Sequence, residues 1–208
     1  MFITLEGGEG AGKTTQMMNM AEMFFEPKKL PWVITREPGG TEIGKQIRQI
    51  LKSTNNTVLA PEAELFLFLA DRTQHIKQII TPALNRGDIV ICDRYLDSTF
   101  AYQGVARNLK VDLAGLHQLF DVPIPDITFL LDLPIGLGLS RAWHQIINGK
   151  RDYTQARFEN EKFSFHENLR RGYLRLAKQE PHRFCVIDAK QSEEKVWRDI
   201  QKILNTFF

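Results

Sequence analysis

The sequence is short of cysteine, of net charge and of long apolar runs, and each shortage excludes a class of protein. It has two cysteines, Cys92 and Cys185, and no CxxC pair, which argues against a disulfide scaffold and against a zinc site. The formal net charge is only +2, whereas a dedicated nucleic-acid-binding protein typically has a large excess of basic residues. No apolar stretch approaches the roughly 20 residues that span a bilayer, and the first residues do not resemble a signal peptide. We therefore expect a cytoplasmic protein with reduced thiols.

The sequence alternates short apolar runs with longer segments of helical periodicity. The runs are almost continuously apolar, as in parallel strands that are covered on both faces. This alternation predicts a doubly wound α/β fold, with a five-stranded parallel sheet and helices on both faces. The chain of 208 residues is long enough to bury one core, so we expect a single domain over residues 1–208. The expected strands are Phe2–Glu6, Trp32–Arg36, Asp88–Asp93, Asp126–Leu133 and Arg183–Asp188. The expected helices are Gly12–Phe25, Glu42–Lys52, Pro61–Leu84, Val111–Phe120, Ile135–Ile147, Gln155–Gln179 and Ser192–Asn205.

A glycine-rich segment after the first expected strand fits the P-loop pattern G-x-x-x-x-G-K-[ST]. Its glycines let the backbone turn with the amide groups pointing inward, where they can wrap the phosphates of a nucleotide at the start of the next helix. Lys13 would reach the β- and γ-phosphates, and the Thr14 hydroxyl could bind Mg²⁺. The segment lies between an expected strand and an expected helix, as a P-loop requires. The predicted ATP-binding residues are Gly7, Gly8, Glu9, Gly10, Ala11, Gly12, Lys13, Thr14 and Thr15.

A P-loop by itself does not separate kinases from switch GTPases, motors or ligases. A GTPase should also carry an Asn-Lys-x-Asp guanine reader, and the sequence has none. Residues 112–115 fit D-x-x-G, but they lie within an expected helix and not at the end of a strand. The P-loop therefore predicts a nucleoside triphosphate as ligand, and the class must come from other residues.

Charged side chains fall where the expected strands end. In doubly wound sheets, ligands bind beyond the carboxyl ends of the strands, and Glu9, Arg36, Asp93 and Arg94 all lie there. Two arginines near a phosphate-binding loop suggest a second phosphate site, because the planar guanidinium binds phosphate with two parallel hydrogen bonds. The pattern indicates an acceptor that is itself a monophosphate.

Several strings of residues together resemble bacterial thymidylate kinases. They are the P-loop, Thr35–Thr41 (TREPGGT), Asp93–Gly104 (DRYLDSTFAYQG), Pro125-Asp126 into Leu131-Asp132, and Arg157–Glu159 followed by Arg171–Leu174. The resemblance covers nearly the whole chain, and its Asp-Arg-Tyr…Ala-Tyr-Gln string is highly specific. It implies a P-loop kinase fold with a small lid, phosphorylation of dTMP by ATP with Mg²⁺, and a homodimer formed through helices on one face of the sheet.

The resemblance also implies roles for residues at the phosphate end of the acceptor site. Arg36 and Arg94 would hold the acceptor phosphate, and Asp93 would act near Mg²⁺ together with Thr14. Glu9 would accept a hydrogen bond from the 3′-hydroxyl of the sugar.

At the base end, the resemblance places Phe68 in a stack on the acceptor base and Arg72 in a hydrogen bond to a base carbonyl. The two residues are four apart in an expected helix, so they share a face. Tyr102, Gln103 and Thr99 would complete the pocket for the sugar and the base.

The polar segment 148–157 interrupts two helical patterns, contains Gly149, and is expected to form a mobile lid. Some thymidylate kinases carry a basic residue inside the P-loop, where this sequence has Glu9, Gly10 and Ala11, so the resemblance implies that a lid cation acts on the transferred phosphoryl. Arg151 and Arg157 are the candidates, with Lys150 and Arg141 behind them, and we favour Arg151 because it follows the glycine. Ala156 stands where relatives have an acid. The expected catalytic cations are Lys13, Arg94, Arg151 and Arg157.

Two other functions remain open at the level of the sequence. One is a kinase for another monophosphate, such as dUMP, or for a broader set of deoxynucleotides. The other is a nucleotide-dependent switch or binding module without an acceptor. ADP formation that depends on an added monophosphate would separate an enzyme from a switch. A nucleic-acid-binding ATPase is disfavoured by the small net charge.

Overall fold

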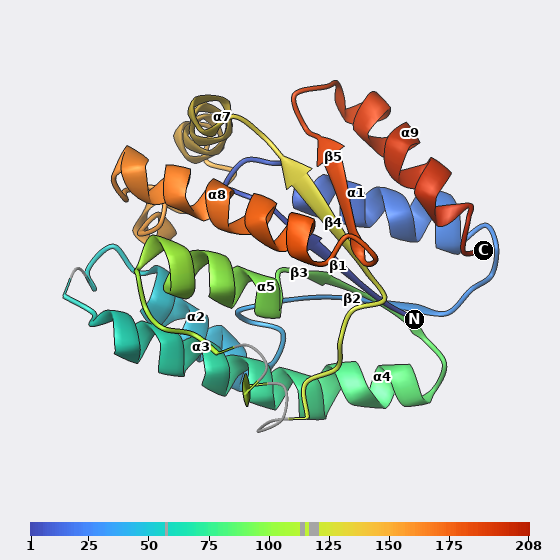
Figure 1. The fold of residues 1–208 in the computed structure, drawn as a ribbon, viewed down its shortest axis with the longest axis horizontal. Coiled ribbons are helices and arrows are strands. Elements are labelled where there is room, and N and C mark those ends of the chain that lie inside the picture. Colours follow the sequence, from blue (N-terminus) through green and yellow to red (C-terminus); the bar gives the residue numbers. More distant parts are fainter. Residues whose placement is uncertain (57, 113–114, 117–120) are drawn as a thin grey trace.

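A computed structural model of the chain describes residues 1–56, 58–112, 115–116 and 121–208. Within these residues, five parallel strands form one sheet in the order β2-β3-β1-β4-β5 (Figure 1). The predicted five-stranded parallel sheet is therefore confirmed. The strands are β1 (Phe2–Glu6), β2 (Trp32–Arg36), β3 (Ile89–Asp93), β4 (Ile127–Asp132) and β5 (Phe184–Asp188).

Helices connect the strands; η1, η2 and η3 are π-helical segments that follow an α-helix, and η4 is a short 3-10 helix. The first half of the chain has α1 (Lys13–Asn19), η1 (Met20–Phe25), α2 (Glu42–Lys52), α3 (Pro61–His75), η2 (Ile76–Ile80), α4 (Thr81–Asn85), α5 (Leu96–Thr99) and η3 (Phe100–Ala106). The second half has α7 (Ile135–Ile147), η4 (Tyr153–Gln155), α8 (Phe163–Gln179) and α9 (Glu193–Leu204). Among the described residues, no helix is long and apolar enough to cross a membrane.

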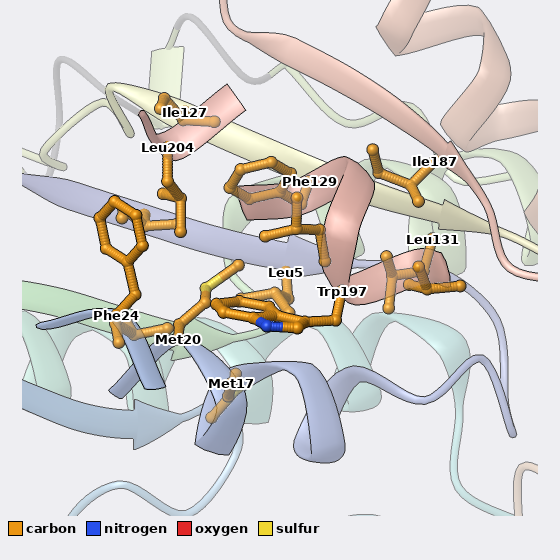
Figure 2. Packing of buried hydrophobic residues seen from close by; sticks show 14 of the residues in the cluster. Leu5, Met17, Met20, Phe24, Ile127, Phe129, Leu131, Ile187, Trp197 and Leu204 are labelled. Atoms are coloured by element: carbon orange, nitrogen blue, oxygen red, sulfur yellow. The ribbon is translucent and has the colours of Figure 1, made fainter. Parts of the chain in front are cut away.

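The sheet is covered on both faces because its central strands are apolar on both sides. All five residues of β1 are buried. On one face, Leu5 and Phe129 pack against Met17 of α1 and Trp197 of α9 (Figure 2). On the other face, α8 and η3 cover β4, while η2 and α4 cover β3. Burial on both faces explains why the strands read as continuous apolar runs.

The parallel arrangement places the P-loop, the segment after β2 and the segment after β3 at one edge of the sheet. Gly12 caps α1 with a φ of 92°, a conformation that favours glycine. Gly138 of α7 lets the P-loop approach closely, because a Cβ atom there would lie 2.5 Å from the carbonyl oxygen of Glu9. The functional edge is thus fixed by β1, β3 and α7 together.

The helices differ from the prediction in two places, and a third predicted helix lies mostly outside the described residues. The helix expected at Gln155–Gln179 is wrong in its first part, since α8 begins at Phe163. Residues 157–160 form turns instead, and the Arg157 amide donates to the carbonyl oxygen of Lys52 in α2. The helix that α5 and η3 form over residues 96–106 was not predicted, because its residues were interpreted as site residues rather than as a helical face. The expected helix Val111–Phe120 falls mostly outside the described residues.

Candidate functional site

A cavity of about 970 Å³ opens at the carboxyl edge of the sheet. Its walls come from the P-loop, the ends of β2 and β3, α2, α3, η3, the end of α7 and the segment 148–159. Most of the predicted site residues line it. They are Glu9, Gly10, Ala11, Gly12, Lys13, Thr14, Thr15, Arg36, Phe68, Arg72, Asp93, Arg94, Thr99, Tyr102, Gln103 and Arg151. Gly7 and Gly8 lie behind the loop, against a small void beside α8.

Lys13 is the buried cation of the P-loop. Its Nζ donates to the carbonyl oxygens of Gly7 and Gly8 at 3.1 and 3.0 Å. Burial and the neighbouring Arg94 lower the pKa of Lys13 to about 8. The ammonium is therefore held within the loop by backbone oxygens that a phosphate could replace.

Glu9, Arg94 and Tyr102 form a cluster on the cavity wall. Glu9 Oε1 accepts from Arg94 Nη2 at 3.0 Å and from the Tyr102 hydroxyl at 2.7 Å. Burial alone would raise the pKa of Glu9, but Arg94, Lys13 and Lys52 outweigh it and hold the pKa well below its usual range. Glu9 is thus an ionised acceptor, suited to a hydroxyl of a ligand.

A second layer behind this cluster holds Arg94. Glu6 accepts hydrogen bonds from the Tyr95 amide at 2.7 Å, from Ser98 Oγ at 2.7 Å and from the Tyr173 hydroxyl at 2.8 Å. The same Tyr173 hydroxyl accepts from Arg94 Nη1 at 3.0 Å. Burial, and next the charge of Asp97, raise the pKa of Glu6 to about 7. Sequence reasoning missed this layer, because Tyr173 is separated from Glu6 by 167 positions.

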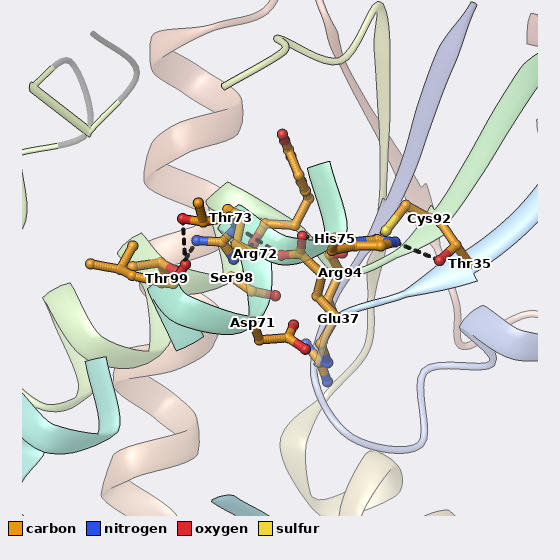
Figure 3. A network of polar contacts seen from close by, with 12 residues as sticks. Thr35, Glu37, Asp71, Arg72, Thr73, His75, Cys92, Arg94, Ser98 and Thr99 are labelled. Atoms are coloured by element: carbon orange, nitrogen blue, oxygen red, sulfur yellow. Dashed lines mark hydrogen bonds and ion pairs between the residues drawn. The ribbon is translucent and has the colours of Figure 1, made fainter. Parts of the chain in front are cut away.

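Arg72 lies at the end of the cavity that α3 and η3 line, in the polar network of Figure 3. It donates to Glu37 at 2.7 Å, to Thr99 Oγ1 at 2.7 Å and to the Tyr95 carbonyl oxygen at 3.0 Å. Glu37 also contacts His75 Nδ1 at 2.9 Å, which fixes the carboxylate. The guanidinium is therefore rigid, and its predicted contact with a base stays a prediction.

Aromatic side chains surround the same end. Phe68 is half-buried and lies 6.3 Å, between ring centroids, from Phe158, which also packs edge-on against Tyr102. Gln103 Nε2 donates to Glu64 at 2.8 Å, which leaves its side-chain oxygen as an acceptor. This end of the cavity can hold a flat aromatic ring and form hydrogen bonds to the polar atoms on the edge of that ring.

Asp93 and Thr14 fit a divalent cation in their chemistry. Both line the cavity, and Asp93 Oδ1 is buried without a hydrogen-bond partner in the described part of the chain. No group of three or more His, Cys, Asp or Glu side chains among the described residues is arranged to hold a metal. A cation here would need oxygen ligands from phosphates as well, as Mg²⁺ in nucleotide sites does.

The structure separates the two candidate lid arginines. Arg151 lines the cavity, with Nη2 2.6 Å from Glu159 Oε1 and 3.9 Å from Glu9 Oε2. Arg157 is buried outside the cavity lining, where it donates to Glu64 Oε2 at 2.6 Å and to the carbonyl oxygen of Leu51. Arg151 is thus placed at the cavity, whereas Arg157 is tied to α2 and α3 outside it.

Three charged residues of the cavity wall were missed from the sequence. Arg48 and Lys52 lie four positions apart on α2 and both face the cavity, and Glu159 is the buried partner of Arg151. The four-residue spacing of Arg48 and Lys52 could have indicated a shared cationic face, but a solvent-exposed helix face shows the same spacing. Lys150 and Arg141, the lesser candidates, also line the cavity.

A P-loop that faces a second, cation-lined binding site across one cavity defines a P-loop kinase acting on a small phosphorylated molecule. Comparison with known proteins makes this specific. A model of the thymidylate kinase family matches residues 5–200, and the chain belongs to that family.

Individual relatives agree with the family assignment. The chain is 50% identical over 191 residues to a thymidylate kinase of Desulfosudis oleivorans, covering 91% of this chain and 89% of the relative. It is 46% identical over 205 residues to a thymidylate kinase of Geobacter sulfurreducens, covering 98% and 95%. The crystal structure of a thymidylate kinase from Ehrlichia chaffeensis superposes with a TM-score of 0.76 at 34% identity, covering 98% of each chain.

Proposed function

We propose that this protein transfers the γ-phosphoryl group of ATP to the phosphate of dTMP, which gives dTDP. The observation that carries the proposal is the hydrogen-bonded cluster in which Glu9 of the P-loop joins Arg94 and Tyr102 on the cavity wall. An acceptor monophosphate bound there would have its phosphate beside Lys13 and its base beside Phe68. Phosphoryl transfer needs mainly positioning and neutralisation of charge, and this wall supplies both.

The donor would lie on the P-loop. Backbone amides of residues 7–15 would wrap its phosphates, and Lys13 would leave the carbonyl oxygens of the loop to bind the β- and γ-phosphates. Thr14 and Asp93 would hold Mg²⁺, which neutralises charge on the phosphates when it is bound. The unpartnered oxygen of Asp93 supports this role.

The acceptor would lie across the cavity. Arg36 and Arg94 would bind its phosphate, and Glu9 would accept the 3′-hydroxyl. Tyr102 would lie under the sugar and disfavour a 2′-hydroxyl. The base would stack on Phe68, with its polar edge facing Arg72, Thr99 and Gln103.

Arg151 would stabilise the charge that develops on the transferred phosphoryl. It lies on the segment 148–157, which we propose to be the lid of a single kinase domain over residues 1–208. Its present partners, Glu159 and Glu9, keep it beside the P-loop. The two free cysteines suit a reducing cytoplasm.

A coupled assay of ADP release tests the function. With ATP and Mg²⁺, dTMP, dUMP, dCMP and UMP are compared as acceptors, and Lys13→Ala serves as the inactive control. One methyl group in an apolar pocket is worth roughly 10–200-fold in kcat/KM, so dTMP should exceed dUMP by about that factor. Equal values for dTMP and dUMP would favour the broader kinase, and ADP release without an acceptor would favour the switch.

A further inference from the structure

Lys52 is the last residue of α2 and lines the cavity, but none of the ligand contacts proposed above involves it. We propose that its ammonium is a further binding group for the acceptor and contacts the phosphomonoester of the bound monophosphate. The inference rests on the proposed function, since it assumes an acceptor with a phosphate at this end of the cavity.

The position of Lys52 is set by the fold. Its side chain is 9% exposed and lines the cavity, one helical turn after Arg48 on the same face of α2. Its carbonyl oxygen accepts a hydrogen bond from the Arg157 amide at 3.3 Å, and Thr54 donates to the carbonyl oxygen of Thr154 at 2.9 Å. The end of α2 is thus joined to the lid segment, so Lys52 is not on a frayed helix end.

The ammonium has no direct partner among the residues that the structure describes. It makes no hydrogen bond and no ion pair there, although the carboxylates of Glu9 and Glu159 are the anions that it faces. Both carboxylates already have closer cations: Arg94 lies 3.0 Å from Glu9, and Arg151 lies 2.6 Å from Glu159. Lys52 therefore acts on Glu9 only through its charge, which helps to lower the pKa of Glu9, and it forms no direct pair with either carboxylate.

A buried ammonium without a partner is costly, because burial removes the water that solvates its charge. Burial lowers the pKa of Lys52 to about 8. The negative charge of Glu9 acts against this shift, and the positive charge of Arg48 adds to it. A phosphate dianion between α2 and the P-loop would relieve the cost, because it supplies charge and hydrogen-bond acceptors together. Arg36 and Arg94 lie at strand ends and Lys52 lies on a helix, so the phosphate would be bound from two sides.

Binding of dTMP and thymidine by calorimetry tests the proposal, because the two ligands differ only in the phosphate. Lys52→Met keeps the length of the side chain and removes the charge, whereas Lys52→Arg keeps the charge. A hydrogen bond to a charged group is worth roughly tenfold or more in affinity. We expect Lys52→Met to weaken dTMP by at least about that factor and to leave thymidine unchanged, and Lys52→Arg to retain most of the dTMP affinity.

A matched control comes from the same helix. Lys45 is exposed and pairs with Glu42, so Lys45→Met should alter neither ligand. An equal loss for both ligands in Lys52→Met, or no loss for either, would overturn the proposal. Lys52→Gln is examined in the same way if Lys52→Met folds poorly, as judged by thermal unfolding.

The proposed function can fail separately. If the unaltered protein binds no dTMP and releases no ADP with it, the function and this inference both fall. If the unaltered protein is active on dTMP and Lys52→Met binds dTMP as tightly, only the role of Lys52 falls.

Discussion

At the scale of single residues, the cavity brings cations to the place where phosphates would bind, and these cations keep the carboxylate of Glu9 ionised. Glu9 is the central example, since Arg94, Lys13 and Lys52 together hold its pKa low although it is buried. The arrangement makes Glu9 a permanent hydrogen-bond acceptor. It also means that the loss of one cation changes a charge balance as well as a contact.

Arg151→Ala should lower kcat much more than it raises the KM for ATP. The reason is that the guanidinium would contact the transferred phosphoryl mainly in the transition state. Arginines in such positions are worth roughly 10³–10⁵ in kcat in the best-studied enzymes, and we expect a loss of at least about 10²-fold. Steady-state kinetics with saturating dTMP measures it, and Arg151→Lys should recover part of the loss. A kcat within a few-fold of that of the unaltered protein would rule out this role.

Glu6→Gln should make the free energy of unfolding less dependent on pH. The pKa of Glu6 is raised from 4.5 to about 7 in the folded protein, so the native state binds the proton more tightly than the unfolded chain does. This contribution to stability is present below about pH 4.5 and is lost as the pH rises through about 7; the shift corresponds to about 3 kcal/mol.

Urea unfolding at about pH 5 and about pH 7 measures the effect. The unaltered protein should lose stability between the two values, and Glu6→Gln should lose less. Ser98 and Tyr173 can rotate their hydroxyl groups to accept from the new amide, which keeps the variant folded. The same slope in both proteins would contradict the assignment to Glu6.

At the scale of elements, the P-loop is positioned by its contact with α7. A Cβ atom on Gly138 would lie 2.5 Å from the carbonyl oxygen of Glu9, whereas one on Gly136, in the same helix, would meet nothing within 4 Å. Backbone cannot yield as a flexible side chain can. The two glycines therefore form a natural pair for testing the contact.

Gly138→Ala should displace the P-loop, weaken ATP binding and lower the melting temperature, by roughly 1–3 kcal/mol in stability. Gly136→Ala should be neutral or slightly stabilising, because alanine is the better helix former. Thermal unfolding and nucleotide titration compare the pair. Equal behaviour of the two variants would show that the contact with α7 does not position the loop.

The lid is also an element whose placement depends on distant partners. Arg157 is bound to Glu64 of α3, which also accepts from Gln103 and Arg107. Gln103, which lines the cavity, and Arg157 of the segment 148–157 therefore share one carboxylate. Residues 157–160 form turns, where periodicity alone predicted a continuation of the helix.

At the scale of the whole molecule, α2 and α3 expose apolar side chains on the outer side of the cavity wall. Ile43 and Ile50 of α2 are 53% and 45% exposed, and Phe66 of α3 is 69% exposed. Exposed apolar side chains grouped on neighbouring helices favour association. The resemblance to thymidylate kinases implies a homodimer, and we propose this face as its interface.

In a homodimer that forms through this face, Phe66→Glu should give a monomer, because it places a charge in an apolar interface. Light scattering after size-exclusion chromatography gives the mass. Met23→Glu is the control, since Met23 is 55% exposed on η1, on the opposite face of the sheet. A monomeric unaltered protein, or a dimer that persists in Phe66→Glu, would reject this interface.

Local sequence determined the elements and the P-loop. Apolar runs become strands because burial on both faces requires continuous hydrophobicity, and the spacing of glycines, Lys13 and Thr14 is a local property of one turn. The sequence also placed Arg36, Asp93 and Arg94 together, because the carboxyl ends of parallel strands lie at one edge of the sheet.

Only the tertiary structure decided which charges serve the cavity and which are tied elsewhere. Arg151 and Arg157 look alike in the sequence, yet Glu159 holds the first at the cavity and Glu64 holds the second away from it. Lys52 looks like a solvated helix residue, and Glu6 looks like the end of a strand. The environments of both residues depend on partners that are distant in the chain. The fold brings these charges together, and only the complete set of them determines the pKa of a buried carboxylate or ammonium.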